Sequence, residues 1–207
     1  MDDGRPTIFV VDDDASVRDA LGNLLESVGF NAQVFGSTEQ FRRASRPDSP
    51  SCLVLDVRLP GANGLDFQQA LERAGISIPI IFITAHGDVR SASRALRAGA
   101  VEFLMKPFQK DELLAAIHQA LERDRSQRVE HAELAVLQSR FAELTSRERE
   151  VLDLVVSGLT NKEIGNKLGI SEVTTKIHRG QVVRKMNATS LAELVRMSDK
   201  LKPRIAR

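Results

Sequence analysis

The sequence predicts a doubly wound α/β domain on a five-stranded parallel sheet, followed by a smaller all-α domain of four helices. Runs of Val, Ile, Leu and Phe recur through the first half of the 207 residues, and helical patterns lie between them. Such runs are typical of strands that are buried on both faces of a parallel sheet. After Thr145 these runs stop and short capped helices follow, which indicates a second domain of a different class.

The predicted elements of the first domain alternate between strand and helix. Strands are expected at residues 8–11, 32–35, 52–55, 80–83 and 101–105. Helices are expected at residues 15–28, 37–44, 64–74 and 88–98, and a long helix begins near Lys110. Short connections between alternating strands and helices favour a parallel sheet with helices on both faces.

The long helix contains a polar stretch, residues 124–128, at which the two domains are expected to reorient. Its apolar stripe resumes at Leu134, Leu137, Phe141 and Leu144. That second stripe fits a linker helix, a dimer seam or a packing surface against either domain. The predicted boundaries are 1–122 for the first domain, 123–142 for a helical linker and 143–207 for the second domain.

Capping residues define the helices of the second domain. Residues Thr145–Glu148, Thr160–Glu163 and Ser190–Glu193 match the capping-box pattern, and Ser171 is a good N-cap. Helices are expected at about residues 145–157, 160–168, 171–186 and 190–200. The tight turn at Gly169 makes a helix-turn-helix, in which the longer third helix would read DNA.

Charge and composition restrict the partners and the compartment. Residues 144–207 carry 13 Lys and Arg against 7 Asp and Glu, whereas residues 1–143 have a net charge of −5. This asymmetry indicates a polyanion partner for the second domain only. The chain has no Trp or Tyr, a single Cys52, no run of membrane-span length and no signal-peptide core. We therefore expect a cytoplasmic protein, with Cys52 as a buried small hydrophobe in a reducing compartment.

Five polar residues follow apolar runs, at the predicted carboxyl ends of the strands: Asp12, Asp13, Asp56, Thr84 and Lys106. The ligand crevice of an open α/β sheet lies at those ends, so one site should gather all five. Three crowded carboxylates repel each other and need a cation, and oxygen ligands of this kind suit Mg²⁺. The hydroxyl and the ammonium suit a phosphoryl group, so the sequence predicts a site that phosphorylates an aspartate.

The motifs of the first domain resemble those of the receiver domain of two-component response regulators. They are VVDDD at 10–14, LVLDVRLPGANG at 53–64, FITAHGD at 82–88 and AVEFLMKPF at 100–108. Residues 144–186 are similar to the LuxR-type helix-turn-helix. Together they resemble the NarL/FixJ group, and most closely its FixJ and StyR branch. The resemblance implies a flavodoxin-like sheet with strand order 2-1-3-4-5.

The resemblance also implies a role for each matching residue of the first domain. Asp56 matches the aspartate that accepts a phosphoryl group from a sensor histidine kinase. The implied Mg²⁺ ligands are Asp12, Asp13, Asp56 and the backbone carbonyl of Arg58. Lys106 matches the lysine that pairs with the phosphoryl group, and Thr84 and Phe103 match the switch positions.

For the second domain, the resemblance implies contacts with double-stranded promoter DNA. The matching residues are Lys162, Thr174, Thr175, Lys176, Ile177, Arg179 and Arg184. Gly180 departs from relatives that often carry a side chain there, so the operator sequences of those relatives are not carried over to this chain. RNA polymerase is a further implied partner, as is a second copy of the chain in a homodimer that phosphorylation promotes.

The predicted function is therefore a phosphorylation-dependent transcription regulator. It would be a stoichiometric phosphoacceptor with at most slow self-dephosphorylation, and not an enzyme. One alternative is an aspartyl-phosphate phosphatase of the haloacid dehalogenase type, because Asp12-x-Asp14 matches the opening motif of that class. Another alternative is a receiver that acts only through protein contacts.

Overall fold

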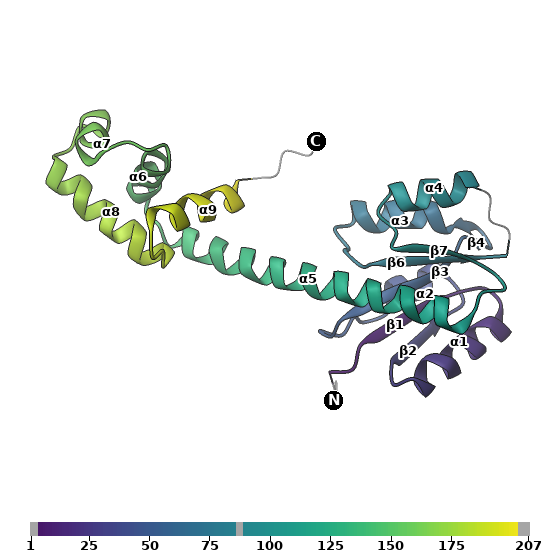
Figure 1. Cartoon of the computed structure of the whole chain (residues 1–207). Helices are drawn as coiled ribbons and strands as arrows, with labels where there is room; N and C mark the ends of the chain where they lie inside the picture. The colour runs from purple at the N-terminus through teal and green to yellow at the C-terminus, as the bar shows by residue number, and fades with distance from the viewer. Residues whose placement is uncertain (1–3, 86–88, 203–207) are drawn as a thin grey trace. The chain divides into compact units, whose positions relative to one another are not determined.

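The chain forms two compact units, Met1–Gln127 and Arg128–Arg207. The structure, a computed structural model, describes residues 4–85 and 89–202. Figure 1 shows a sheet flanked by helices in the first unit and helices alone in the second. None of the described helices combines the length and the apolar character that a membrane span requires.

The first unit is built on a parallel sheet in the order β2-β1-β3-β6-β7. Its strands are β1 (Thr7–Val11), β2 (Asn31–Phe35), β3 (Ser51–Asp56), β6 (Ile80–Thr84) and β7 (Glu102–Met105). Counted along the five predicted strands this is the order 2-1-3-4-5, so the predicted sheet is confirmed. A two-stranded antiparallel ribbon of β4 (Arg58–Leu59) and β5 (Ala62–Asn63), which was not predicted, follows Asp56 directly.

Helices cover both faces of this sheet. They are α1 (Ala15–Ser27), α2 (Thr38–Arg43), α3 (Gly64–Arg73), α4 (Val89–Arg97) and α5 (Lys110–Ala142). The predicted start of the fourth helix, Asp88, lies outside the described residues. Asp14, Ser37 and Asn63 cap α1, α2 and α3 through side-chain oxygens that accept backbone N–H bonds.

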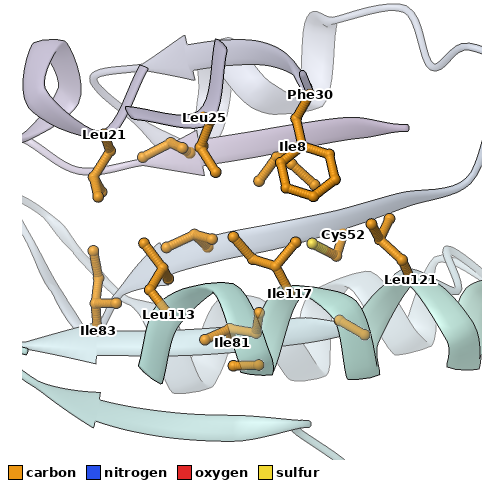
Figure 2. Close-up of a cluster of buried hydrophobic side chains, with 14 residues drawn as sticks. Ile8, Leu21, Leu25, Phe30, Cys52, Ile81, Ile83, Leu113, Ile117 and Leu121 are labelled. Carbon is orange, nitrogen blue, oxygen red and sulfur yellow. The ribbon is translucent and has the colours of Figure 1, made fainter. Parts of the chain in front are cut away.

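The period-two alternation of the buried strands separates two cores. Ile8 and Cys52 face α1 and the first turns of α5, where Leu113, Ile117 and Leu121 close over them (Figure 2). The residues of opposite parity, such as Phe9 and Leu53, pack with α2, α3 and α4 in the other core. Cys52 is fully buried, as expected, and burial raises the pKa of its thiol.

Helix α5 continues without interruption through the polar stretch at residues 124–128. Asp124 in that stretch is only 4% exposed, and its carboxylate accepts the backbone N–H of Ser51 at 3.0 Å. Since Ser51 is the first residue of β3, this bond attaches α5 to the strand that carries Asp56. The stretch is therefore partly a packing segment of the first unit, although every residue in it is polar.

The second unit contains α6 (Ser146–Val156), α7 (Asn161–Leu168), α8 (Glu172–Met186) and α9 (Leu191–Leu201). Each predicted helix end lies within one residue of the observed end. The capping boxes at Thr145 and Thr160 are present. At the third, Glu193 instead accepts the backbone N–H of Thr189 at 2.7 Å, although Ser190 still caps α9.

The core of the second unit also includes the last turns of α5. Leu137, 7% exposed, joins Leu144, Ile164, Val182 and Leu194 in one buried cluster. Gly169 ends α7 with φ 66°, in the left-handed region that glycine adopts at little cost. This turn carries the chain from α7 into α8, so the predicted helix-turn-helix is present.

Candidate functional sites

Three carboxylates meet at the carboxyl ends of neighbouring strands β1 and β3. Ligand oxygens of Asp12, Asp13 and Asp56 all lie within 4.8 Å of one another. Asp12 is fully buried and Asp56 is 7% exposed, whereas Asp13 is exposed to solvent. Carboxylate oxygens at such separations can act together as ligands of a hard divalent cation. The structure thus brings the three predicted acidic residues together.

Lys106 follows β7 and reaches across the sheet into this acidic cluster. Its Nζ donates to Asp12 Oδ2 at 2.5 Å and to Asp56 Oδ2 at 2.7 Å. The backbone N–H of Lys106 also donates to the carbonyl of Thr84 at 2.8 Å, which fixes the start of the lysine side chain. One ammonium facing three carboxylates leaves a surplus of two negative charges, which matches a divalent cation.

Burial and the ion pairs act in opposite directions on Lys106 and Asp12. Burial lowers the pKa of the Lys106 ammonium, but its hydrogen bonds to Asp12 and Asp56 outweigh burial and raise that pKa above the ordinary 10.5. Burial raises the pKa of the Asp12 carboxyl from 3.8, and the hydrogen bond from Lys106 opposes this rise. Lys106 therefore stays positively charged at neutral pH, and Asp12 is a carboxylate whose charge a cation would stabilise.

Close backbone packing holds Asp56 in place. A Cβ at Gly64, the first residue of α3, would lie 2.5 Å from the backbone oxygen of Asp56 and 3.2 Å from the ring of Phe82. Only glycine lets α3 begin so close to the end of β3. The backbone N–H of Arg58 donates to Asp56 Oδ1 at 2.9 Å, which orients the carboxylate. The metal-binding role of the Arg58 carbonyl stays a prediction.

Thr84 and Phe103 lie on the neighbouring strands β6 and β7. Thr84 is 1% exposed and ends β6, one residue beyond Ile83, which is the partner of Asp56 in the β3–β6 register. Phe103 is half-buried and packs against Phe82, with ring centroids 6.4 Å apart. Phe103 also packs against the core under α3 and α4, and the switch role of Thr84 and Phe103 stays a prediction.

The predicted DNA-reading helix α8 presents a mixed basic and apolar surface. Lys176, Arg184 and Ile177 are exposed, and Lys162 of α7 is exposed as well. Arg184 donates to Gln181 Oε1 at 2.5 Å on the same helix. These four side chains are free to meet a ligand without unpacking the core.

Three other residues predicted to contact DNA use their side chains inside the unit. Thr175 is fully buried, and its hydroxyl donates to the carbonyl of Ser171 at 3.1 Å. Thr174 shares a 2.8 Å hydroxyl bond with Ser171, and Arg179 donates to Asn161 Oδ1 at 3.0 Å. The structure does not place Thr175 on the exposed face, because its hydroxyl faces α7, where a Cβ at Gly165 would lie 3.3 Å from it.

The sequence did not predict the residues that hold the acidic side chains in position but do not themselves contact a ligand. Gly64 fits too closely against Asp56 for any side chain, and the only sequence signal is its place at the end of the Gly61–Gly64 turn. Arg18 donates to the backbone carbonyl of Asp12 at 2.8 Å, a contact that no motif indicates. For Asp124 the sequence showed only a fully polar stretch, which does not indicate its burial.

Both units match known families. Residues 8–118 match the response regulator receiver domain, and residues 142–198 match the luxR family of bacterial regulatory proteins. Nodulation protein W of Bradyrhizobium diazoefficiens is 52% identical over 197 residues, which are 95% of this chain and 87% of that protein. The transcriptional regulatory protein FixJ of the same organism is 39% identical, over 92% of this chain and 93% of FixJ.

A solved structure resembles the chain over nearly its full length. The response regulator StyR has 47% sequence identity and a TM-score of 0.81, and the match covers 95% of this chain and 99% of StyR. Relatives of this coverage carry both units in the same order, and so the two family matches describe one two-domain protein.

Proposed function

The chain belongs to the response regulators that join a receiver domain to a LuxR-type DNA-binding domain, and on that premise we propose that a sensor histidine kinase phosphorylates Asp56 to control transcription. The cluster of Asp12, Asp13 and Asp56 beside Lys106 is the observation that supports this function most directly.

The proposed chemistry is transfer of a phosphoryl group between two side chains. A carboxylate oxygen of Asp56 attacks phosphorus, the bond between phosphorus and the kinase histidine breaks, and the electron pair returns to that imidazole nitrogen. Lys106 already lies 2.7 Å from Asp56 and is positioned to pair with the transferred oxygens. The chain is a stoichiometric acceptor, with slow self-dephosphorylation as its only turnover.

Asp12, Asp13, Asp56 and the backbone carbonyl of Arg58 would hold Mg²⁺. The surplus of two negative charges and the all-oxygen donor set fit this ion. When bound, the cation neutralises charge that develops on the phosphoryl oxygens.

Phosphorylation then acts through Thr84 and Phe103. The Thr84 hydroxyl moves toward the new phosphoryl group, and the Phe103 ring, which packs against Phe82, changes its position in response. This change favours a homodimer, and the second unit then binds promoter DNA and contacts RNA polymerase. The exposed basic residues of α8 and Lys162 supply the affinity for duplex DNA.

The phosphatase alternative needs Asp12 and Asp14 as its catalytic pair. Asp14 instead caps α1, where its carboxylate accepts the backbone N–H of Ser16 at 2.8 Å. The acidic cluster contains Asp13 in its place. The alternative that acts through protein contacts alone leaves the LuxR-type unit without a role.

Labelling by a small-molecule phosphodonor with Mg²⁺ tests the acceptor. We expect the intact chain to form one acyl phosphate that hydroxylamine cleaves, and Asp56→Asn to form none. Asp14→Asn is the matched control, because asparagine is also a good N-cap and the residue stands outside the cluster. Labelling of Asp56→Asn at the level of the unchanged chain would rule out Asp56 as the acceptor.

A further inference from the structure

Helix α8 exposes two large apolar side chains on one stripe. Val173 is 70% exposed, the largest exposed fraction among the large hydrophobic side chains that the structure describes, and Ile177 is 59% exposed. Residues four apart on a helix lie one above the other, so the two side chains form a continuous apolar strip over the first two turns.

This exposure is not the result of loose packing. Thr175, Val182 and Met186 on the other side of α8 are fully buried in the core of the second unit. The N-terminus of the helix is fixed as well, because Ser171 Oγ accepts the backbone N–H of Thr174 at 3.0 Å. A rigid helix therefore presents Val173 and Ile177 outward at fixed positions.

The surroundings of the strip indicate a nucleic acid as its occupant. Lys176 lies between the two apolar residues in sequence and is exposed, and Arg184 extends the exposed face two turns further on. Residues 128–207 carry 15 Lys and Arg against 10 Asp and Glu, a net charge of +5. An apolar strip with basic neighbours on a basic unit fits the major groove of a duplex.

The major groove offers one apolar group at the base edges, the C5 methyl of thymine. We propose that Val173 is a specificity-determining residue that packs, together with Ile177, against the methyl groups of two thymines in each half-site. The inference rests on the proposed DNA-binding function and adds to it a residue and a base. Gly180 comes next on the stripe, where a Cβ would meet nothing within 4 Å, so apolar readout stops after the second turn.

The test removes the methyl group without changing the base pairing. The full chain, phosphorylated by a small-molecule phosphodonor with Mg²⁺, first selects duplexes from a random pool, and each thymine of the enriched site is then replaced singly by deoxyuridine. We expect two positions per half-site at which this replacement weakens binding by about fourfold, the value of one buried methyl group. Replacement at the remaining thymines should leave affinity unchanged.

A double-mutant cycle that combines Val173→Ala with each deoxyuridine replacement shows which thymine the Val173 side chain contacts. In that variant the deoxyuridine penalty should disappear at one sensitive position and persist at the other, which belongs to Ile177. Val34→Ala, the same change at a valine that is 41% exposed on β2 of the first unit, is the control and should keep both penalties.

Three results would count against the proposal. If the pool yields no enriched duplex, the DNA-binding function itself fails and this inference fails with it. If an enriched site shows no sensitivity to deoxyuridine, only the methyl readout is wrong. If both penalties persist in Val173→Ala, that residue does not read DNA and its exposed side chain serves a different partner.

Discussion

At the scale of single residues, Gly64 determines how closely α3 can approach the acceptor Asp56. Because a Cβ there would lie 2.5 Å from the backbone oxygen of Asp56, Gly64→Ala must displace the end of β3 or the start of α3. We expect a loss of about 1–3 kcal/mol in the free energy of unfolding. We also expect slower labelling by a phosphodonor, because Asp56 moves relative to Lys106.

Gly22→Ala is the matched control for this prediction. Gly22 lies within α1, and a Cβ there would meet only Val34 Cγ1, at the ordinary contact distance of 3.5 Å. Alanine should therefore stabilise the helix by about 0.5–1 kcal/mol and leave the labelling rate unchanged. Equal effects of the two substitutions would show that crowding at Gly64 is not what constrains the site.

Asp13 permits a test of the metal that leaves the buried part of the site intact. Since Asp13 is exposed, Asp13→Ala should fold normally, but it removes one carboxylate from the cluster. Mg²⁺ at 100 times its Kd should stabilise the unchanged chain by about 2.7 kcal/mol. Calorimetry should show a rise in the Tm of the first unit that is largely lost in Asp13→Ala.

Asp66→Ala serves as the control for the metal experiment. Asp66 is an exposed carboxylate of α3 that pairs with Arg94 at 3.0 Å and stands outside the acidic cluster. This variant should keep the full Mg²⁺ effect. A Tm that rises equally in all three proteins would mean that Mg²⁺ acts elsewhere on the chain.

At the scale of the elements, Glu148 links three parts of the second unit. It is 4% exposed, accepts the backbone N–H of Thr145 at 2.8 Å, and pairs with Lys185 of α8 at 2.6 Å. Burial alone would raise the pKa of Glu148, but the bonds from Lys185 and Thr145 outweigh it and lower that pKa below 4.5. The charged form of Glu148 therefore stabilises the fold.

A lowered pKa in the folded state contributes stability that is fully present above pH 4.5 and is lost as the pH falls through the folded value. Glu148→Gln should lower the free energy of unfolding by about 1–3 kcal/mol at neutral pH. Amide hydrogen exchange in α6 and α8 measures this loss. The loss should shrink as the pH falls below 4.5 and through the pKa that Glu148 has in the folded protein.

Glu150→Gln tests whether burial matters to this effect. Glu150 pairs with Arg147 at 2.6 Å, but their side chains are 52% and 33% exposed. A surface ion pair of this kind contributes about 0–1 kcal/mol. If Glu150→Gln lowers the free energy of unfolding as much as Glu148→Gln does, then the burial of Glu148 between α6 and α8 does not strengthen its ion pair.

The elements differ in how far the sequence could predict them. The predicted strands and the helices of the second unit follow from local signals: buried runs such as residues 80–83 and N-caps such as Thr145 and Ser171. The ribbon of β4 and β5 escaped prediction because two-residue strands leave no periodic pattern. The burial of Asp124 could not be predicted because it depends on contact with Ser51, which is 73 residues away in sequence.

The same distinction applies to the site. Asp12, Asp13, Asp56, Thr84 and Lys106 could be predicted together because a parallel sheet aligns its carboxyl ends, whatever the details of packing. Thr175 shows the opposite case, since the resemblance placed it in a DNA-facing segment while helical geometry turns it into the core. Which face of a helix is buried depends on tertiary contacts that a motif does not contain.

At the scale of the whole molecule, the core of the second unit extends beyond the limits that its helix caps suggested. Leu137 of α5 is buried in that core, and Arg140 donates to the backbone carbonyl of Met186 at 3.3 Å. Glu133 also pairs with Lys200 at 2.9 Å. A fragment that begins at residue 128 keeps these contacts, whereas one that begins at residue 140 loses Leu137 and Glu133.

Two fragments therefore separate folding from regulation. Residues 140–207 should be less stable than residues 128–207 by about 2–5 kcal/mol, the effect of removing one buried leucine side chain. Only the longer fragment is then suitable for asking how the first unit affects DNA binding. Circular dichroism during urea denaturation gives the comparison in a chain that has no Trp or Tyr.

The uneven charge of the chain predicts how the longer fragment binds DNA. The whole chain has a net charge of +1, because residues 1–127 carry −4 and offset most of the +5 of residues 128–207. The fragment should therefore bind a scrambled duplex more tightly than the unphosphorylated chain at low salt, and this advantage should shrink as salt screens the charges. Titrations of both proteins across a salt series provide the measurement. Weaker binding by the fragment at every salt concentration would mean that the first unit promotes DNA binding, as dimerisation through that unit would require.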